Sequence, residues 1–548
     1  MQTYTLAAEA AANGNPLLNI AIFGAFIVVT LFIVTKAGKT TSESSDFYTG
    51  GASFSGTQNG LAIAGDYLSA ASFLGIVGSI ALSGYDGFLY SIGFFVAWLV
   101  ALLLVAEPLR NVGRFTMADV LSFRLRQKPV RVAAAFGTLF VSLFYLIAQM
   151  AGAGSLVSVL LDLHSFAAQA ICVAIVGVVM IVYVLVGGMK GTTYVQMIKA
   201  VLLITGVLIM SILAFVVAKG GLNAIFDQAI EAHANSAYLA EKGYVAENIM
   251  QPGLKYGATT TSKLDFISLG LSLVLGTAGL PHVLMRFYTV PTAKEARKSV
   301  TWAIVLIGSF YLLTLILGYA AAAFVGPDRI LAAPGGANAA APLLAFELGG
   351  SIFMALIAAV AFATVLAVVA GLAITASASI AHDVYAAVLR DGQATEDEQV
   401  RVSRITVVVL GIVSIILGIL AMTQNVAFLV SLAFAIAASA NLPTILYSLY
   451  WKRFNTTGAV VSIYTGLISA LVLIFLSPAV SGTPTAMFPN ADWSIFPLSS
   501  PGLISIPLGF LGGIIGTFLG KPDNFDELQA EMEVRSLTGV GVEAPVDH

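Results

Sequence analysis

The chain has 548 residues, of which 58% are hydrophobic and only 10% are charged. A soluble globular protein carries about 25% charged residues, so a surface this poor in charge must mostly face lipid. The net charge of −3 argues against a nucleic-acid partner, and the single cysteine, Cys172, excludes a disulfide framework and cysteine-rich metal sites. The composition therefore predicts an all-α protein that crosses a membrane many times.

Thirteen stretches have the length and apolar character of a spanning helix, which needs about 20 mostly apolar residues. In chain order they cover residues 17–35, 58–83, 87–106, 132–157, 168–187, 197–217, 264–286, 300–325, 344–380, 404–421, 425–449, 456–477 and 500–519. The stretch 344–380 is long enough to include a tilted or broken helix. Together these spans predict a transmembrane domain over 17–520. An exposed tail, 1–16, precedes it, although the alanines there leave a cleaved secretory signal as the alternative.

The positions of lysine and arginine predict the orientation, because cytoplasmic segments between spans are enriched in these residues. With the N-terminus outside, 21 of the 26 basic residues fall on the cytoplasmic side. The C-terminal tail, 521–548, is then cytoplasmic, and we expect a solvated segment with a short amphipathic helix near residues 524–534. The outside segments 218–262 and 478–499 are long enough to hold structure of their own.

Two segments rich in small residues are predicted to be broken helices, which occur within lipid only where they line a cavity. The first covers 58–82, and the second, 265–287, contains the run Gly279-Leu280-Pro281. Counting five spans from each gives the sets 58–217 and 264–449. Because five is odd, the two sets must cross the membrane in opposite senses, which is the inverted-repeat architecture of many transporters.

The step from Gly279 to Pro281 predicts the end of one half-helix and the start of the next, since glycine favours helix ends and proline suits the first helical turn. The N-terminus of the new half-helix would favour a carboxylate. A simple kink in a packing helix is the alternative. His282, beside the break, is a candidate gate or proton group because its charge changes near neutral pH. A structural histidine is the other interpretation.

Asp66 is the one acid that the predicted spans place well inside the membrane, where an unpaired carboxylate costs about 2.5–3.5 kcal/mol or more. It could carry a proton, attract a cation, or cap backbone groups freed by the break beside it. Tyr67 and Tyr90 could each offer a hydroxyl to a substrate oxygen, with ordinary core packing as the alternative. Thr364 stands alone among apolar residues and is a candidate ligand for a cation.

Several runs of residues carry a family resemblance. The shorter runs are Gly187-Gly188-Met189 and Gly279-Leu280-Pro281-His282 followed by Arg286-Phe287, and the longer blocks cover 42–59, 66–75, 107–123 and 362–372. They resemble the sodium:solute symporter family, and the longer blocks resemble its acetate and monocarboxylate branch. This resemblance, over about residues 17–520, implies a LeuT-like inverted-repeat fold with alternating access. It also implies uptake of acetate, propionate or pyruvate across a bacterial plasma membrane, driven by a cation gradient.

The resemblance further implies a sodium site on the first broken helix and on the eighth helix of the ten-helix core. Its backbone carbonyls would be those of Gly65 and Leu68, or those of the preceding residues at positions 64 and 67. Thr364 would supply another ligand.

The sequence departs from this sodium-site pattern at three places. Ala367 and Val368 stand where paired hydroxyls are expected, and the segment 191–196 lacks an acid that many relatives carry. Because sodium is a hard cation that requires oxygen ligands, the losses weaken the sodium interpretation and make Asp66 a candidate proton carrier. Both ions stay open, with a slight preference for the proton.

For the substrate, position matching within the family points to Ser72, Tyr90 or Ser91, Thr277 and His282. A two- or three-carbon acid needs a small pocket with one anion clamp, and the residues expected to supply it are Ala70, Ala71, Phe73 and the half-helix that starts at Pro281. No arginine or lysine is expected deep in any span, so helix dipoles and hydroxyls would have to hold an anion.

Two other functions fit the sequence less well. A passive channel more often shows a repeated pore-lining motif. A membrane-embedded enzyme needs paired catalytic groups, and the chain contains no H-E-x-x-H, no G-x-S-x-G and no second intramembrane acid to partner Asp66. We therefore predict a secondary transporter without catalytic residues, with no cofactor beyond the coupling ion, H+ or Na+. Its partners are a small monocarboxylate and the lipid bilayer.

Overall fold

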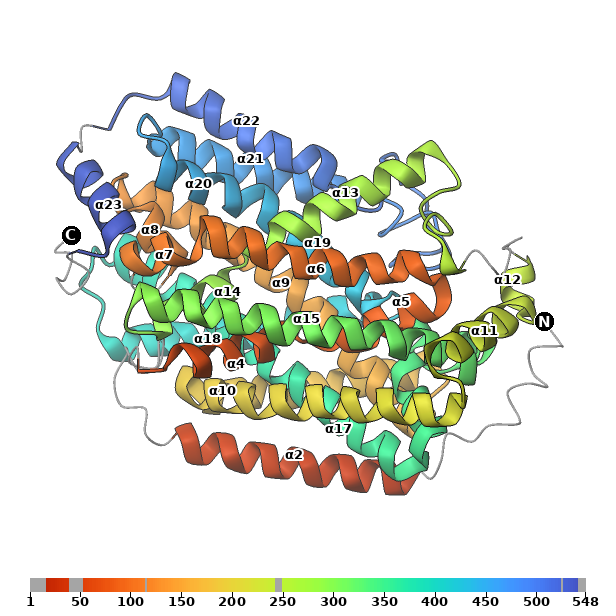
Figure 1. Ribbon diagram of the computed structural model, residues 1–548. Helices are drawn as coiled ribbons and strands as arrows, with labels where there is room; N and C mark the ends of the chain where they lie inside the picture. Colours follow the sequence, from red (N-terminus) through yellow and green to blue (C-terminus); the bar gives the residue numbers. More distant parts are fainter. Residues whose placement is uncertain (1–15, 39–52, 114–115, 242–248, 524–525, 541–548) are drawn as a thin grey trace.

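The computed structural model describes residues 16–38, 53–113, 116–241, 249–523 and 526–540, which form a bundle of helices (Figure 1). Eleven of these helices are long and apolar enough to cross a membrane, and a bent pair makes a twelfth span. α2 (Pro16–Gly38) lies where the first span is predicted. The predicted all-helical membrane fold is therefore confirmed for the described residues. Apart from Pro16, the predicted tail 1–16 lies outside them.

The first set of five spans begins with a broken helix. Its elements are α4 (Gly56–Tyr67), η2 (Ala71–Gly75), α5 (Ile76–Ser83), α6 (Tyr85–Leu104), α9 (Gln127–Leu161) and α10 (Phe166–Ala218). α10 holds two candidate spans, Phe166–Leu185 and Thr193–Ala218. The short helices α7 (Ala106–Val112) and α8 (Met117–Leu121) connect α6 to α9.

The second set also begins with a broken helix, as the inverted-repeat interpretation requires. Its elements are α13 (Thr260–Gly276), η4 (Thr277–Gly279), α14 (Pro281–Met285), η5 (Arg286–Thr289), α15 (Ala293–Phe324), α17 (Ala340–Ala378), η7 (Ser379–Leu389), α18 (Glu396–Leu420), α19 (Val426–Ile436), η8 (Ala437–Asn441) and α20 (Leu442–Tyr450). Of the tilted or broken helix allowed for within 344–380, the structure shows the break: α17 is interrupted at Gly350, which has a φ of 69°.

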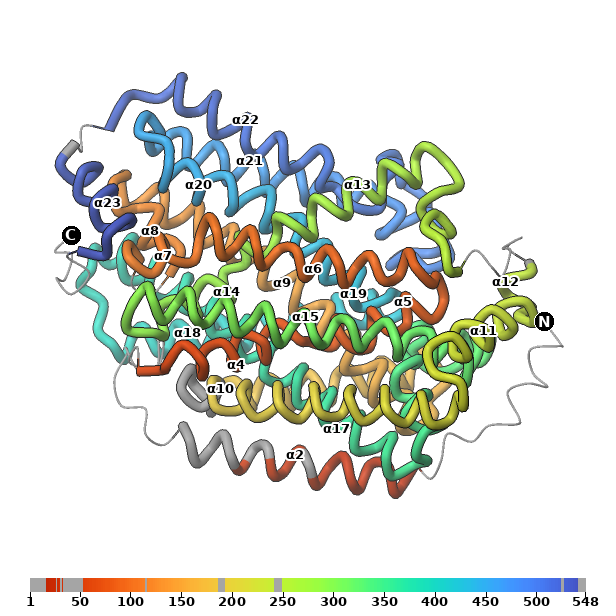
Figure 2. The backbone as a smooth tube through the Cα atoms, in the orientation of Figure 1, coloured from red at the N-terminus to blue at the C-terminus, as the bar shows by residue number. Residues whose placement is uncertain are grey.

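The broken helices and their neighbours form the inside of the bundle, and more regular helices flank them. Almost every residue of α19 is buried. α2 packs on α10 and α17 at one flank, while α21 (Thr456–Phe475) and α22 (Gly502–Leu519) pair at the other (Figure 2). Outer positions such as Leu103 and Leu519 expose large apolar side chains, as expected where a helix faces lipid.

Short helices occupy the segments between and after the spans. The predicted outside segment 218–262 holds α11 (Gly221–Ala234) and α12 (Ala237–Glu241), while α16 (Pro327–Ala332) and η6 (Gly336–Ala339) precede α17. In the segment 478–499, Ser481 and Phe488 form an isolated bridge. Both segments therefore hold structure of their own.

The C-terminal tail differs from the solvated segment expected from the sequence. α23 (Asp526–Thr538) shows that the tail contains a helix near the expected position, but this helix packs against α7. Met532 is buried, the Asn111 side-chain amide donates to the Ser536 carbonyl (3.0 Å), and Lys452 pairs with Glu533 (2.9 Å). The helix docks because burying its apolar side chain removes it from water. Residues 541–548 lie outside the described part of the chain.

Candidate functional site

The first broken helix bends directly after Tyr67. α4 meets the next helix at an angle of 61°. The Leu68 N–H still donates to the Ala64 carbonyl (2.9 Å), whereas the Ser69 N–H turns back to the Tyr67 carbonyl (2.9 Å). The break predicted within 58–82 is therefore confirmed, and it turns the Tyr67 side chain toward the second broken helix.

The second broken helix is interrupted at Leu280. This residue is extended (φ −77°, ψ 113°), and Pro281 occupies the first turn of α14, as predicted. The Gly279 carbonyl accepts a hydrogen bond from the Asn441 side chain (2.9 Å), and a Cβ on Gly279 would lie 2.5 Å from the Ala437 carbonyl oxygen. α14 has only five residues before the turn η5, so few peptide dipoles align and the expected helix-dipole clamp is weak.

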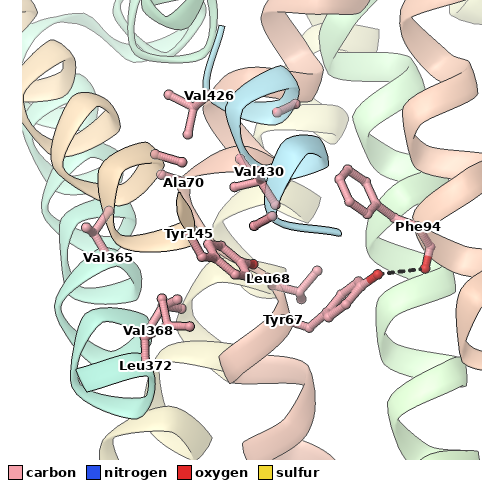
Figure 3. Packing of buried hydrophobic residues seen from close by; sticks show 14 of the residues in the cluster. Tyr67, Leu68, Ala70, Phe94, Tyr145, Val365, Val368, Leu372, Val426 and Val430 are labelled. Carbon is pink, nitrogen blue, oxygen red and sulfur yellow. Dashed lines mark hydrogen bonds between the residues drawn. The ribbon is translucent and has the colours of Figure 1, made fainter. Parts of the chain in front are cut away.

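A chain of hydroxyl groups connects the two breaks. The Tyr67 hydroxyl donates to the Phe94 carbonyl (3.0 Å; Figure 3) and lies 2.9 Å from the Thr277 hydroxyl, which must then donate to it. The Ser72 hydroxyl donates to the Tyr67 carbonyl (3.1 Å) and accepts from Tyr311 (3.1 Å). The structure thus brings together three predicted substrate residues and adds Tyr311, which the sequence analysis missed.

Tyr90 lies apart from this hydroxyl chain. Its hydroxyl is 3.4 Å from that of Tyr256, and Lys255 lies over its ring, 6.0 Å from the centroid. Both partners belong to the segment that precedes α13. Ser91, the alternative to Tyr90, bonds the Thr314 hydroxyl (3.1 Å). Tyr90 therefore links α6 to the predicted outside segment.

His282 is a buried imidazole without a hydrogen-bond partner among the described residues. Only 3% of its surface is exposed, and both ring nitrogens lack a partner. The ring stands edge-on to that of Tyr145, with centroids 5.2 Å apart. A buried polar group left unpaired costs about 1–3 kcal/mol, so these nitrogens are available to a bound carboxylate or water next to the second break.

Asp66 forms an ion pair with Arg286, 2.5 Å from carboxylate oxygen to Nε. The Gln196 amide donates to the other carboxylate oxygen, and Arg286 also donates to the Thr193 hydroxyl (2.7 Å). The expectation that no arginine or lysine lies deep in a span is wrong, because η5 continues inside the bundle after α14 and Lys199 is also buried. Since two donors hold the carboxylate, the geometry favours the structural role for Asp66 over proton carriage.

Groups of α17 expected at or near the sodium site are hydrogen-bonded to other protein groups in the structure. The Thr364 hydroxyl donates back to the Ala361 carbonyl (2.6 Å), and the Thr364 carbonyl accepts from Lys199 (2.9 Å). On the same helix the Ala367 carbonyl accepts from Gln196 (3.0 Å). Side chains from α10 thus occupy the space between α4 and α17.

The two positions at which the family pattern expects hydroxyls are apolar and packed. Val368 points toward Leu68 and the Tyr145 ring (Figure 3), and Gly65 packs so closely that a Cβ there would lie 2.2 Å from the Gln196 carbonyl oxygen. Gln196 and Lys199 supply the side chains that bond this region. The sequence does not single them out, because Gln196 carries no charge and Lys199 stands near the start of an apolar run.

A second group of charges joins α8, α9 and η7 near α23. Arg131 pairs with Asp119 (2.9 Å) and Asp383 (2.7 Å), and Ser379 donates to Asp383 (2.9 Å). Burial raises the pKa of Asp119, but His382 and Arg131 outweigh it and hold that pKa well below its usual range. A cavity lies between this group and the second break. Its lining residues are Thr116, Met117, Thr138, Pro281, Met285, Thr375 and Ser379.

Comparison with known proteins agrees with the fold and with the family resemblance. The model of the sodium:solute symporter family matches residues 47–466. A monocarboxylic acid transporter of Corynebacterium glutamicum is 78% identical over 548 residues, covering all of both chains. The uncharacterized symporter YwcA of Bacillus subtilis is 51% identical over 96% of this chain and 98% of its own.

A solved structure shows the same fold. It is the substrate-bound, outward-open state of a Na+-coupled sialic acid symporter, with a TM-score of 0.63 and 18% identity, covering 92% of this chain and 98% of that one. The chain therefore belongs to the sodium:solute symporter family, as its sequence motifs predicted.

Proposed function

We propose that the protein takes up short-chain monocarboxylates such as acetate, propionate and pyruvate together with a proton or a sodium ion, by alternating access around the two helix breaks. The observation that carries this proposal is the contact between Tyr67, at the first break, and Thr277, at the second. Any rearrangement that separates the breaks must open this hydrogen bond, which frees the Thr277 O–H and one side of the Tyr67 hydroxyl for a substrate. The name of the Corynebacterium relative supports the substrate class.

The chemistry around the breaks suits a small acid better than a sugar. The polar side chains described above at the breaks are the hydroxyls of Tyr67, Ser72, Thr277 and Tyr311 and the unpaired imidazole of His282. The remaining neighbours are apolar: the Phe94 and Phe434 rings pack against the Tyr67 ring. A sugar needs many hydrogen-bond partners, because each polar group left unpaired on binding costs free energy, whereas one carboxylate and one or two carbons need few.

The proposal includes a place and an orientation. We place the chain in the plasma membrane of a bacterium, with the N-terminus outside and the C-terminus in the cytoplasm, because 21 of 26 basic residues then lie inside. In this orientation α7, α8 and α23 lie at the cytoplasmic end, and the segment that holds α11 and α12 lies outside.

The transport function is tested with purified protein in liposomes. Under inward gradients of both sodium and protons, labelled pyruvate should accumulate above its outside concentration, and unlabelled acetate and propionate should compete with it. Liposomes without protein, and competition with an unrelated sugar, are the controls. Pyruvate that only equilibrates, whatever gradient is imposed, would contradict coupled transport and indicate a passive channel.

Replacing Tyr67 with phenylalanine should weaken substrate binding while leaving the fold intact. The change removes the hydroxyl shared by Thr277 and the Phe94 carbonyl but keeps the ring that packs on Trp98. Loss of one such hydrogen bond costs about 1 kcal/mol or more, which is about a fivefold rise in the pyruvate concentration at half-maximal uptake. The matched control is Tyr319→Phe, because the buried Tyr319 hydroxyl donates to the Ile249 carbonyl (2.7 Å), away from the breaks. Equal effects of the two variants would remove Tyr67 from the binding site.

A further inference from the structure

Lys199 is a buried ammonium-bearing side chain with one backbone partner. It lies six residues into the span Thr193–Ala218, which is about 9 Å along the helix. Only 2% of its surface is exposed, and its Nζ donates to the Thr364 carbonyl (2.9 Å). Taking an ammonium out of water costs several kcal/mol unless it is paired, and a single neutral carbonyl compensates only part of that cost. Such a group calls for an explanation beyond packing.

The charges near Lys199 already sum to a net positive charge, which disfavours binding of a further cation. Asp66 on α4 and Arg286 on η5 are the charged groups that act on it, so the fully ionised cluster carries one negative and two positive charges. Asp66 also interacts electrostatically with three titratable groups on neighbouring helices, namely Tyr145 of α9, Tyr183 of α10 and His282 of α14. A sodium ion at the Thr364 carbonyl would add a third positive charge in a medium where charges interact strongly.

The other helices that pack on this part of α10 offer no compensating acid. α17 contributes the carbonyl and hydroxyl of Thr364 and the carbonyl of Ala367. α15 and α18 carry their charged residues in their first three turns, and α2 carries its lysine near its end. α9 has charges only in its first two turns, and the acids of α11 come after the C-terminal end of α10, far along the span from Lys199. Among the described residues, Asp66 is thus the one acid that acts on Lys199, and Arg286 already pairs with it. The remaining positive charge is removed when the Lys199 ammonium gives up a proton.

We propose that Lys199 is the coupling residue of the transporter, its ammonium standing where a bound sodium ion would otherwise contact Thr364 and its amine carrying one proton inward in each cycle. This inference rests on the proposed uptake function. A proton from the outside water binds the nitrogen lone pair and forms the ammonium that holds α10 to α17. The same proton leaves to cytoplasmic water after the substrate is released, which restores the neutral amine.

The proton balance sets what drives transport. One carboxylate anion and one proton enter together, so no net charge crosses the membrane. A pH difference of one unit then sustains about a tenfold accumulation of pyruvate, and a membrane potential alone sustains none. A sodium gradient at equal pH on both sides is also without effect.

The test compares net accumulation with exchange in liposomes that hold wild type, Lys199→Met or Lys199→Gln. Methionine keeps most of the side-chain volume, and glutamine keeps an N–H donor for the Thr364 carbonyl, but neither exchanges a proton. The control is Lys128→Met, an exposed lysine paired with Asp391 at the surface. Labelled pyruvate and a pH-sensitive dye in the lumen report substrate and proton movement in the same vesicles.

Wild type and Lys128→Met should accumulate pyruvate about tenfold per pH unit and acidify the lumen by one proton for each pyruvate. Lys199→Gln should still exchange pyruvate inside the vesicle for pyruvate outside, at a rate within about twofold of wild type. It should neither accumulate pyruvate nor move protons. Lys199→Met should give the same result if the variant folds. Three results would overturn the coupling role of Lys199 without contradicting uptake itself. They are sodium-driven accumulation by the wild type, accumulation by Lys199→Gln, and loss of pyruvate exchange in Lys199→Gln. If the wild type fails to accumulate pyruvate under a proton gradient and also under a sodium gradient, the proposed function itself is wrong.

Discussion

Replacing Arg286 with methionine should prevent most of the protein from folding. The change leaves the Asp66 carboxylate buried beside the Gln196 amide without its cationic partner. Breaking a buried ion pair by removing one partner costs about 3–5 kcal/mol, which is comparable with the entire stability of many proteins, about 5–15 kcal/mol. We expect a large loss of monodisperse protein in detergent and a strongly lowered melting temperature, measured by size-exclusion chromatography and thermal unfolding.

A double variant distinguishes the effect of an unpaired buried charge from the effect of the altered side-chain volume. Asp66→Asn combined with Arg286→Met removes both charges, so it should recover much of the folded protein that the single variant loses. The control is Arg329→Met, because Arg329 pairs with Glu347 at a partly exposed site, where such pairs contribute about 0–1 kcal/mol. If Arg286→Met melts at the same temperature as Arg329→Met, the pair does not stabilise the fold and Asp66 is again a candidate proton carrier.

Replacing Gly65 with alanine should both destabilise the protein and stop uptake. The added Cβ would lie 2.2 Å from the Gln196 carbonyl oxygen, and because that oxygen belongs to the backbone of a helix, no side-chain rotation relieves the clash. α4 and α10 must separate, which also displaces the neighbouring Asp66 and Lys199. Overpacking a buried contact costs about 1–3 kcal/mol, so we expect a lowered melting temperature and pyruvate uptake near background.

The matched control for Gly65 is another helical glycine, Gly270 of α13, where an added Cβ meets no atom within 4 Å. Alanine there should be neutral or stabilising by about 0.5–1 kcal/mol, since glycine loses more chain entropy on folding. Wild-type uptake and stability in Gly65→Ala would show that the contact between α4 and α10 tolerates separation, and that the residues around Asp66 need no close packing.

Features encoded by neighbouring residues were predicted well from the sequence. The break at Leu280 follows from a glycine and a proline two positions apart, and the bend after Tyr67 follows from a local run of small residues. The Tyr67–Thr277 contact was predicted only in part. Both residues are candidate substrate residues by sequence, but they are 210 positions apart, and nothing local indicates that they touch.

Contacts between residues far apart in the sequence could not be predicted from local patterns. Arg286 and Lys199 stand near the ends of apolar runs, and the sequence assigns such charges to loops unless a partner is known. The partner of Arg286 lies 220 positions away, and that of Lys199 lies 165 positions away. Tyr311 sits in an apolar span that gives no local signal, so only the fold reveals its contact with Ser72.

Two π-helical segments lie beside the breaks: η2 directly follows the first, and η8 packs against η4 at the second. A π turn closes its hydrogen bonds between residues five apart and so holds one residue more than an α turn. Moving that spare residue along the helix rotates the residues that it passes by about 100° and shifts them by about 1.5 Å, while only a few hydrogen bonds are exchanged. Side chains next to η2 and η8 can therefore be re-aimed at the cost of a local change in winding, without unpacking the outer helices.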